Sequence, residues 1–315
     1  LDLKKGALET DIKSLKKAAR QTVSPELEKR IQIIVETGLI DLENDFKIYW
    51  KDSPIARLSS GRDYLNPNIE LIVDDILEKN HSQKLLEFLE SWLKNKINIT
   101  LKSLIDLKNL KEKNSSMKAL AYQLYENNGV LKRDQVSEYL KKLGQNERKI
   151  LRDLGVKFGR YHVFLHRLIK PDAVSLRTLL WKNYNQKNFS LKPPTFGLNF
   201  LDNNKVKDRN FMLLCGFEKF ENFFIRIDIL ERLFVQIINS SSEKEKQVKM
   251  MPEMLNLLGC NKENFKKLLK SMNYIVLEKN NETYFKYKPK KIFKKTGKKI
   301  EKENPFGVLK NLNLN

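Results

Sequence analysis

The chain has 315 residues, of which 60 are Lys or Arg and 39 are Asp or Glu, so its formal net charge is +21. Hydrophobic residues make up 41% of it, which is enough to build buried cores and excludes a wholly disordered protein. No run of 18 apolar residues occurs, no pattern typical of a secretory leader opens the chain, and two cysteines exclude a disulfide framework. We therefore expect a cytoplasmic protein with no membrane partner. The first residue is Leu1 rather than Met, and we expect a piece of a longer protein.

The positive charge is unevenly distributed along the chain. Residues 114–200 carry an excess of 10 positive charges and residues 279–315 an excess of 8, whereas residues 1–113 carry an excess of only 1. Charge concentrated in this way indicates a polyanionic partner such as nucleic acid. The alternative is a compositional bias toward Lys and Asn, but such a bias would not by itself leave the first 113 residues almost neutral.

Residues 1–113 are predicted to form a helical domain with a β-hairpin near residues 46–58. Apolar residues recur at helical spacing up to Gly38, and residues 46–58 alternate around a turn at 51–54. The apolar run at 69–73 predicts one more strand. Residues 74–113 are predicted to be helical, with one apolar stripe that we interpret as a core face. The stripe consists of Leu85, Leu86, Leu89, Leu93, Ile97, Leu101, Leu104 and Leu107.

Residues 114–185 predict a basic, helix-turn-helix-like unit. Three short helices are expected to start at Ser116, Asp134 and Asn146, and each is followed by a glycine that ends it. An extended segment, residues 156–165, follows the third helix. Three helices and a strand resemble a helix-turn-helix core with a wing.

Residues 186–240 are predicted to be a linker followed by a strand and a helix. Residues 186–210 are rich in Asn, Lys, Pro and Gly and read as a loop, and a strand at 223–227 leads into a helix over 228–239. Residues 289–315 are predicted to be a basic tail. From Thr283 to Ile300 there are eight lysines and no acidic residue, a pattern typical of an interaction arm.

Residues 243–288 predict a second winged-helix-like domain. Its last helix has apolar residues on one face and lysines on the other, and a hairpin with alternating lysines follows it. This arrangement is typical of a winged helix that meets nucleic acid. The alternative is a winged helix used for packing, with a solvated lysine face. The candidate contacts here and in the tail are Lys266, Lys267, Lys270, Lys286, Lys290 and Lys291.

No catalytic residue, metal site or cofactor site is predicted in this segment. Neither the glycine spacing of a Walker A loop nor that of a dinucleotide-binding loop occurs, and no Asp-Glu pair could serve as a Walker B motif. His162 and His166 have the i, i+4 spacing of a zinc helix, but their segment looks extended and lacks a further ligand. We therefore interpret both histidines as structural or surface residues. Cys215 lies in an apolar run and is predicted to be a core residue.

Cations and aromatic residues alternate most densely in residues 148–181. Cations neutralise phosphates and aromatic faces stack on unpaired bases, so this stretch predicts a contact with single-stranded nucleic acid. The alternative is that the aromatic rings belong to the core and the cations to the surface. The candidate residues are Arg152, Lys157, Phe158, Arg160, Tyr161, Arg167 and Lys170.

The same stretch carries a resemblance to a known family. It is carried by the run Leu154-Gly155-Val156-Lys157-Phe158-Gly159-Arg160-Tyr161-His162-Val163-Phe164-Leu165, then by Leu168-Ile169-Lys170-Pro171 and Leu179-Leu180-Trp181. These runs resemble the C-terminal region of alphaproteobacterial helicases, which are related to the mitochondrial degradosome RNA helicases of the DExH type. Shorter matches lie in order along the chain. They are Trp50 with Pro54-Ile55-Ala56-Arg57-Leu58 and Gly61, Ala121-Tyr122-Gln123-Leu124 with Gly129-Val130-Leu131, Arg226-Ile227-Asp228-Ile229-Leu230-Glu231-Arg232-Leu233, Leu258-Gly259-Cys260, and Asn304-Pro305-Phe306.

The resemblance implies an ATP-dependent RNA helicase whose motor domains would lie upstream of Leu1. ATP and Mg are then expected only for those motor domains, and the chain itself is not assigned an enzymatic activity. His166 stands where the family often has Pro, which puts the end of that strand in question.

We therefore expect a mainly α chain with small β-hairpins, of the α+β class. Its predicted function is to bind single-stranded RNA near the upstream helicase core, with an RNA-processing protein as a possible further partner. Two alternatives remain open at this point. One is a winged-helix DNA-binding regulator, and the other is a protein-interaction scaffold whose binding would survive high salt.

Overall fold

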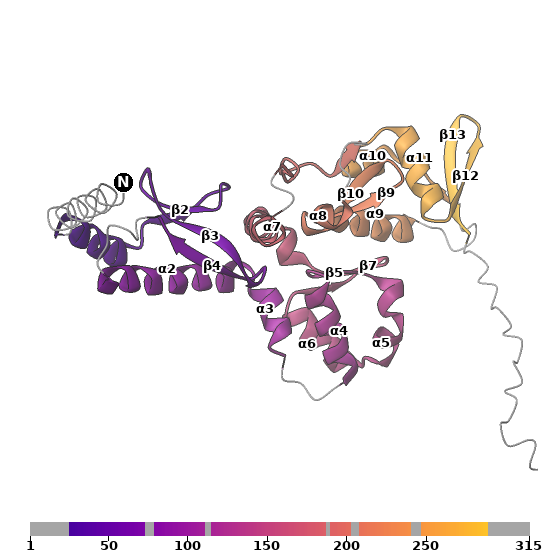
Figure 1. Ribbon diagram of the computed structural model, residues 1–315. Helices are drawn as coiled ribbons and strands as arrows, with labels where there is room; N and C mark the ends of the chain where they lie inside the picture. Colours follow the sequence, from indigo (N-terminus) through magenta and orange to yellow (C-terminus); the bar gives the residue numbers. More distant parts are fainter. Residues whose placement is uncertain are drawn as a thin grey trace, which may run out of the picture. The chain divides into compact units, whose positions relative to one another are not determined.

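A computed structural model describes residues 25–72, 79–110, 115–186, 190–202, 208–240 and 247–288. The chain divides into two compact units, each of which is described by itself. The first comprises Leu1–Ser240 and Met251–Lys262, and the second comprises Ser241–Met250 and Glu263–Asn315. Both contain helices and small antiparallel sheets, so the predicted α+β class is confirmed (Figure 1).

Among its described residues, the first unit opens with helical residues 25–37, and a four-stranded antiparallel sheet follows them. The strands follow one another in the order β1 (Ile40–Leu42), β2 (Lys47–Trp50), β3 (Ser53–Asp63) and β4 (Asn66–Leu71). The predicted hairpin is therefore confirmed as β2 and β3, and the predicted later strand as β4. The turn is shorter than predicted, because Ser53 already pairs with Trp50 and only residues 51–52 remain between the strands.

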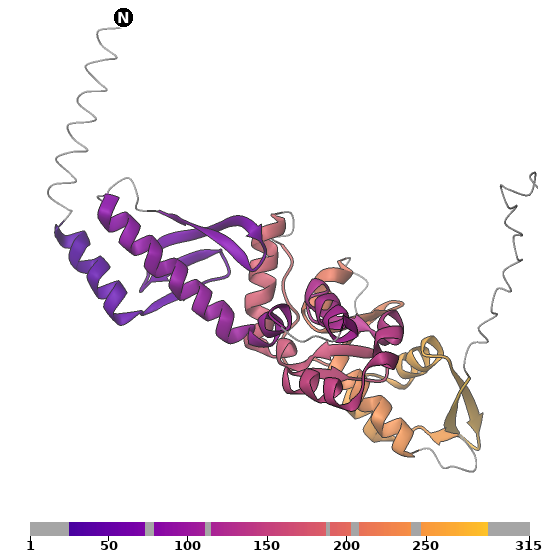
Figure 2. The same ribbon diagram turned by 90° about the horizontal axis from the view of Figure 1, so that it is seen from below.

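The long apolar stripe lies on two helices, α2 (Lys79–Thr100) and α3 (Lys102–Lys108), and α2 runs along the sheet (Figure 2). Leu101 separates the helices with non-helical angles, φ −106° and ψ 23°. The stripe nevertheless continues, because Leu101 is itself fully buried. Burial of one apolar face therefore persists where the backbone angles depart from helical values. The predicted core face is confirmed for all of its residues except Leu86, which is only partly buried.

The next part of the first unit contains more strands than predicted. Its elements are α4 (Ser115–Glu126), β5 (Val130–Lys132), the 3-10 helix η1 (Arg133–Val136), α5 (Ser137–Lys142), α6 (Gln145–Asp153), β6 (Val156–Phe158) and β7 (His162–Leu165). The single extended segment predicted at 156–165 is wrong, because residues 159–161 turn the chain and β6 pairs with β7. The unpredicted strand β5 pairs with the other edge of β7, which gives the sheet order β5-β7-β6.

In the remainder of the first unit, the stretch from the next helix to the next hairpin repeats this pattern with one helix fewer, and two more helices follow it. Its elements are η2 (His166–Ile169), α7 (Pro171–Asn185), β8 (Phe200–Asp202), α8 (Arg209–Leu214), β9 (Phe217–Phe220), β10 (Phe223–Arg226), α9 (Ile227–Ser240) and α10 (Pro252–Leu258). The prediction that residues 186–210 are only a loop is wrong, since β8 pairs with β10. A three-residue strand that pairs with a partner more than twenty residues later leaves little local signal in the sequence.

The second unit contains a helix and a three-stranded sheet. The helix is α11 (Lys262–Ser271), and the strands are β11 (Val248–Lys249), β12 (Tyr274–Lys279) and β13 (Glu282–Tyr287) in the order β11-β13-β12. Phe265, Leu268 and Leu269 are fully buried, and the Phe265 and Phe285 ring centroids lie 6.2 Å apart. The predicted inward face of α11 and the predicted hairpin after it are therefore confirmed.

The three three-stranded sheets share one topology. In each, the third strand lies between the first and the second, and a helix immediately precedes the hairpin. Each of these helices is followed by a residue with positive φ, namely Gly155, Gly216 or Asn273. Its amide donates to the carbonyl oxygen three residues earlier, at 2.9, 2.9 and 3.1 Å respectively. In each of the three cases, a residue in the left-handed conformation at the equivalent position thus turns the chain from helix to strand.

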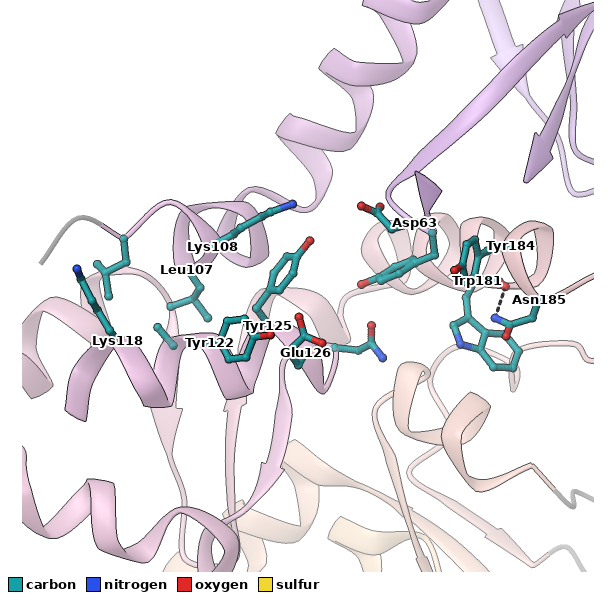
Figure 3. A pocket seen from close by; sticks show the side chains of 14 residues that line it. Asp63, Leu107, Lys108, Lys118, Tyr122, Tyr125, Glu126, Trp181, Tyr184 and Asn185 are labelled. Atoms are coloured by element: carbon teal, nitrogen blue, oxygen red, sulfur yellow. Dashed lines mark hydrogen bonds between the residues drawn. The ribbon is translucent and has the colours of Figure 1, made fainter. Parts of the chain in front are cut away.

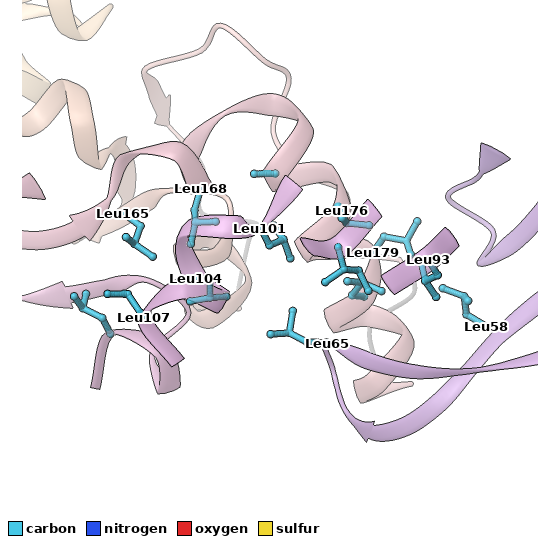
Figure 4. Close-up of a cluster of buried hydrophobic side chains, with 14 of the residues drawn as sticks. Leu58, Leu65, Leu93, Leu101, Leu104, Leu107, Leu165, Leu168, Leu176 and Leu179 are labelled. Carbon is cyan, nitrogen blue, oxygen red and sulfur yellow. The ribbon is translucent and has the colours of Figure 1, made fainter. Parts of the chain in front are cut away.

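One buried cluster runs from Ile31 to Leu180 within the first unit (Figure 4). It joins leucines of β3, α2, α3, β7, η2 and α7, and so crosses the position 113/114 at which the sequence changes in charge. Arg177 of α7 is fully buried nearby and donates to the carbonyl oxygens of Asn128, Leu168 and Leu214 at 2.6–2.7 Å. Burial lowers the pKa of Arg177 to about 10, so this side chain remains charged at neutral pH.

Candidate nucleic-acid interface

The tip of the β6–β7 hairpin, residues 159–162, includes the first residue of β7 and is held by hydrogen bonds from the residue that follows β5. Within the tip, the amide of Gly159 donates to the carbonyl oxygen of His162 at 2.8 Å. The Arg133 guanidinium donates to the carbonyl oxygen of Gly159, and the Arg133 amide donates to that of Tyr161, both at 2.7 Å. These bonds fix the tip backbone from one side.

From the other side, Glu231 of α9 accepts hydrogen bonds from three successive amides of the tip. The donors are the backbone N–H groups of Arg160, of Tyr161 at 2.9 Å and of His162 at 2.7 Å. Successive amides that converge in this way form an anion-binding concavity, and here a buried carboxylate of the protein occupies it. Hydrogen bonds to a charged acceptor are stronger than neutral ones, so the tip is firmly attached to α9.

The imidazole of His162 links this carboxylate to a second one. Its Nδ1 lies 3.1 Å from Glu231, and its Nε2 lies 3.2 Å from Glu218 of β9. Burial disfavours the imidazolium, but the two hydrogen bonds and the two negative charges outweigh burial and raise the pKa of His162. Burial likewise opposes ionisation of Glu218, but His162, Lys132 and Arg209 together lower the pKa of Glu218 to about 2.

This network holds the hairpin in place and does not form a metal site. The two carboxylates lie at opposite nitrogens of one imidazole ring, so the three side chains do not converge on a point. Within the part of the chain that the structure describes, no group of His, Cys, Asp and Glu is arranged to hold a metal ion.

The structure places Lys157 and Arg160 on the exposed side of this anchored hairpin. Lys157 forms no ion pair with a described carboxylate. Between them, Phe158 is half-buried against the core, and the guanidinium carbons of Arg148 and Arg152 lie 5.9 and 5.6 Å from its ring centroid. Arg148 also donates to two backbone carbonyl oxygens, whereas Arg152 is exposed. The anchored hairpin and the neighbouring end of α6 thus present several cations close to one another.

Tyr161 points toward α9. Its ring centroid lies 4.3 Å from that of Phe234, and its hydroxyl oxygen is inaccessible to solvent. The ring is half-buried, so base stacking by Tyr161 stays a prediction that must compete with this packing. Farther along, Arg167 is exposed and pairs with Asp172 at 2.8 Å, and Lys170 is exposed immediately before α7.

In the second unit, the predicted lysines lie on the solvent side of α11 and β13. Lys267, Lys270 and Lys286 are exposed, whereas Lys266 forms an ion pair with Glu278 of β12. The lysine row of α11 is therefore partly neutralised within the unit. Lys290 and Lys291 lie outside the described residues.

Sequence reasoning did not identify the residues that hold the tip, Arg133, Glu218 and Glu231. A signal for Glu231 was present, since it lies at helical spacing from the buried residues Ile227 and Phe234 and therefore on the apolar face of α9. A carboxylate on a buried face requires partners, but the sequence does not say that they lie 70 residues earlier.

Comparison of the chain with models of protein families, with curated proteins and with solved structures found no match. Among the helices that the structure describes, none has both the length and the apolar character needed to cross a membrane.

Proposed function

We propose that this chain is a nucleic-acid-binding accessory region that holds single-stranded RNA beside the motor of an ATP-dependent RNA helicase. The observation that carries the binding function is the β6–β7 hairpin, which exposes Lys157 and Arg160 on a backbone fixed by Arg133 and Glu231. Cations on a rigid element meet phosphates with little loss of conformational freedom. The helicase parent, with its ATP and Mg, rests on the family resemblance of residues 154–181 and the shorter matches.

The repeated topology supports the proposal. A helix, a strand, one or more helices and then a hairpin, with the third strand central in the sheet, is the order of elements in a winged helix. We propose two such units in tandem, beginning at α4 and α7, and keep the predicted winged-helix-like domain of residues 243–288 as a further proposal. In this family of motifs, a helix or the wing that follows it contacts nucleic acid. The proposal places the protein in the cytoplasm, with the upstream helicase core and an RNA-processing protein as further partners.

The test replaces the cations of the hairpin and measures binding to a single-stranded RNA. Lys157→Ala combined with Arg160→Ala should weaken binding about tenfold and make the log–log salt slope shallower by roughly 1.4, since each phosphate contact contributes about 0.7. The matched control is Lys84→Ala with Lys94→Ala, which removes two exposed lysines from α2. Equal affinities for the two double variants would contradict the assignment of the interface to the hairpin.

A second candidate, a duplex-DNA-binding regulator, is favoured by the exposed Lys267 and Lys270 on α11 and the hairpin after it. Lys267→Ala with Lys270→Ala would then abolish binding to duplex DNA while the β6–β7 variant would not. Tighter binding to single-stranded RNA than to duplex of equal length supports the first proposal. Binding of a protein partner that survives high salt would favour a scaffold instead.

A further inference from the structure

A second surface of the first unit combines aromatic rings with cations. It is an open pocket of about 710 Å³ between α3, α4, the β3–β4 turn and the end of α7 (Figure 3). Four of the chain's ten tyrosines and one of its three tryptophans line it, so its aromatic content is far above that of the chain as a whole. The volume lies within the range of about 300–1,000 Å³ that is typical of ligand sites.

Two rows of aromatic side chains come from α4 and α7. Tyr122 and Tyr125 lie three residues apart on α4, and Trp181 and Tyr184 lie three residues apart on α7, so each pair projects from one helix face. Tyr122 is 63% exposed and Tyr184 is 43% exposed. Their rings therefore offer faces that the core of the unit does not cover.

The polar groups of the pocket are separated along it. Lys118 lies at one end and Asn185 lies beside Tyr184 at the other, while Asp63, toward which the Lys108 side chain extends, and Glu126 lie between them (Figure 3). The Lys108 ammonium lies 5.1 Å from the Tyr125 ring centroid. The lysines suit phosphates, and the amide of Asn185 together with the carboxylates in the middle of the pocket suits the hydrogen-bonding edges of bases.

We infer that this pocket binds unpaired nucleobases of a single-stranded nucleic acid. The bases would stack on Tyr122 and Tyr184 while the adjoining phosphates approach Lys108 and Lys118. Base–aromatic stacking tolerates any sequence, because every base has a π-face. The ligand class rests on the proposed function, but the site is separate from the β6–β7 hairpin and has its own test.

The experiment compares two polyanions, a single-stranded oligouridine of about ten nucleotides and inorganic polyphosphate, which has no bases. Tyr122→Leu with Tyr184→Leu should weaken oligouridine binding about tenfold and leave polyphosphate binding unchanged. The matched control, Tyr122→Phe with Tyr184→Phe, keeps the rings and should bind oligouridine like the unaltered chain. The variant with Lys157→Ala and Arg160→Ala should instead bind both polyanions more weakly, so failure of one site is distinguishable from failure of the other.

Unchanged oligouridine affinity in the leucine variant would overturn the inference and leave the pocket to a protein partner. An equal loss for both polyanions would also overturn it, because stacking does not act on polyphosphate. Photocrosslinking of a 4-thiouridine oligonucleotide to the unaltered chain keeps the inference testable if the leucine variant does not fold. Crosslinks to the peptides of α4 or α7 that carry Tyr122, Trp181 or Tyr184 support the site, and crosslinks confined to other peptides exclude it.

Discussion

Buried charged residues determine how the β6–β7 hairpin is held. Sequence reasoning interpreted His162 as a structural or surface residue, and the structure places it between Glu218 and Glu231 in the interior. The residue types were visible in the sequence, but the pairing was not, because the partners lie 56 and 69 residues away. Such contacts depend on how whole elements pack, and no local pattern of hydrophobicity or spacing encodes them.

Replacement of Glu231 by Ala should destabilise the first unit strongly. It would leave three backbone amides of the hairpin tip without their acceptor, and an unsatisfied buried group costs about 1–3 kcal/mol. We expect the free energy of unfolding to fall by about 3 kcal/mol or more, measured by urea denaturation. Arg232→Ala is the control at the next, exposed position and should change stability by less than about 0.5 kcal/mol. Similar small effects at both positions would show that the tip does not depend on this carboxylate.

The two neighbouring histidines should give opposite pH dependences of stability. Folding raises the pKa of His162, so its contribution is complete below about pH 6.5 and is lost as the pH rises through its folded-state value. We therefore expect the thermal midpoint to fall as the pH rises above about 6.5, and His162→Asn should remove this component of the fall. Burial lowers the pKa of His166, so His166→Asn should relatively stabilise the protein below about pH 6.5. An identical pH slope in the His162→Asn variant and the unaltered chain would rule out this role.

Elements with a strong local pattern could be predicted, whereas elements defined by distant pairing could not. The helices α2, α4 and α11 follow from apolar spacing that continues over two turns or more. The strands β5 and β8 have three residues each and become strands only because β7 and β10 offer them an edge. Residues 190–202 illustrate the consequence, since their turn-rich composition predicts a loop throughout although the segment ends in a strand.

The junction between helix and hairpin offers a test at the level of the repeated element. Gly155 and Gly216 hold the same place with φ of 91° and 82°, where an L-residue costs about 1–2 kcal/mol. A Cβ on Gly155 would meet only Ser103, at 3.7 Å, whereas a Cβ on Gly216 would lie 2.8 Å from Cγ2 of Ile169. Gly216→Ala should therefore destabilise the chain by roughly 1–3 kcal/mol more than Gly155→Ala in chemical denaturation.

Asn273 is the control for this comparison, since it adopts φ of 65° at the equivalent place in the second unit. Asn273→Gly keeps the left-handed conformation accessible and should change stability by about 1 kcal/mol or less. Equal losses for Gly155→Ala and Gly216→Ala would mean that Ile169 moves aside without cost, and that conformation alone determines the preference for glycine.

At the scale of the whole molecule, composition indicates a polyanionic partner, which stays a prediction, and it does not indicate the arrangement of the core. The charge step near residue 113 marks where the basic surface begins, but the apolar cluster is continuous across it. Net charge depends on the surface residues, whereas the domain is held together by its apolar interior. A change in net charge along the sequence therefore does not locate a boundary of the apolar core. The aromatic pocket was missed for a related reason, since three of its tyrosines come from two helices about sixty residues apart in the sequence and the fourth, Tyr64, comes from the β3–β4 turn.

The distribution of charge gives the last prediction, on the tail at residues 289–315, which lies outside the described residues. Six of the eight lysines between Thr283 and Ile300 belong to it, and no acidic residue lies among them. On single strands, each phosphate that a lysine neutralises contributes about −0.7 to the log–log salt slope. If about half of these lysines engage the RNA, removal of residues 289–315 should make the slope shallower by roughly 2–3 units.

Contacts with phosphates carry no sequence information, so preference among RNA sequences should barely change on truncation. The measurement is affinity against salt concentration for the full and truncated chains on the same oligonucleotide. Binding should weaken without vanishing, because Lys157, Arg160 and Lys170 remain exposed on the first unit. Identical slopes would mean that the tail does not contact the RNA and that its charge reflects composition alone. A complete loss of binding would place the whole site in the tail and leave the anchored β6–β7 hairpin without a role in recognition.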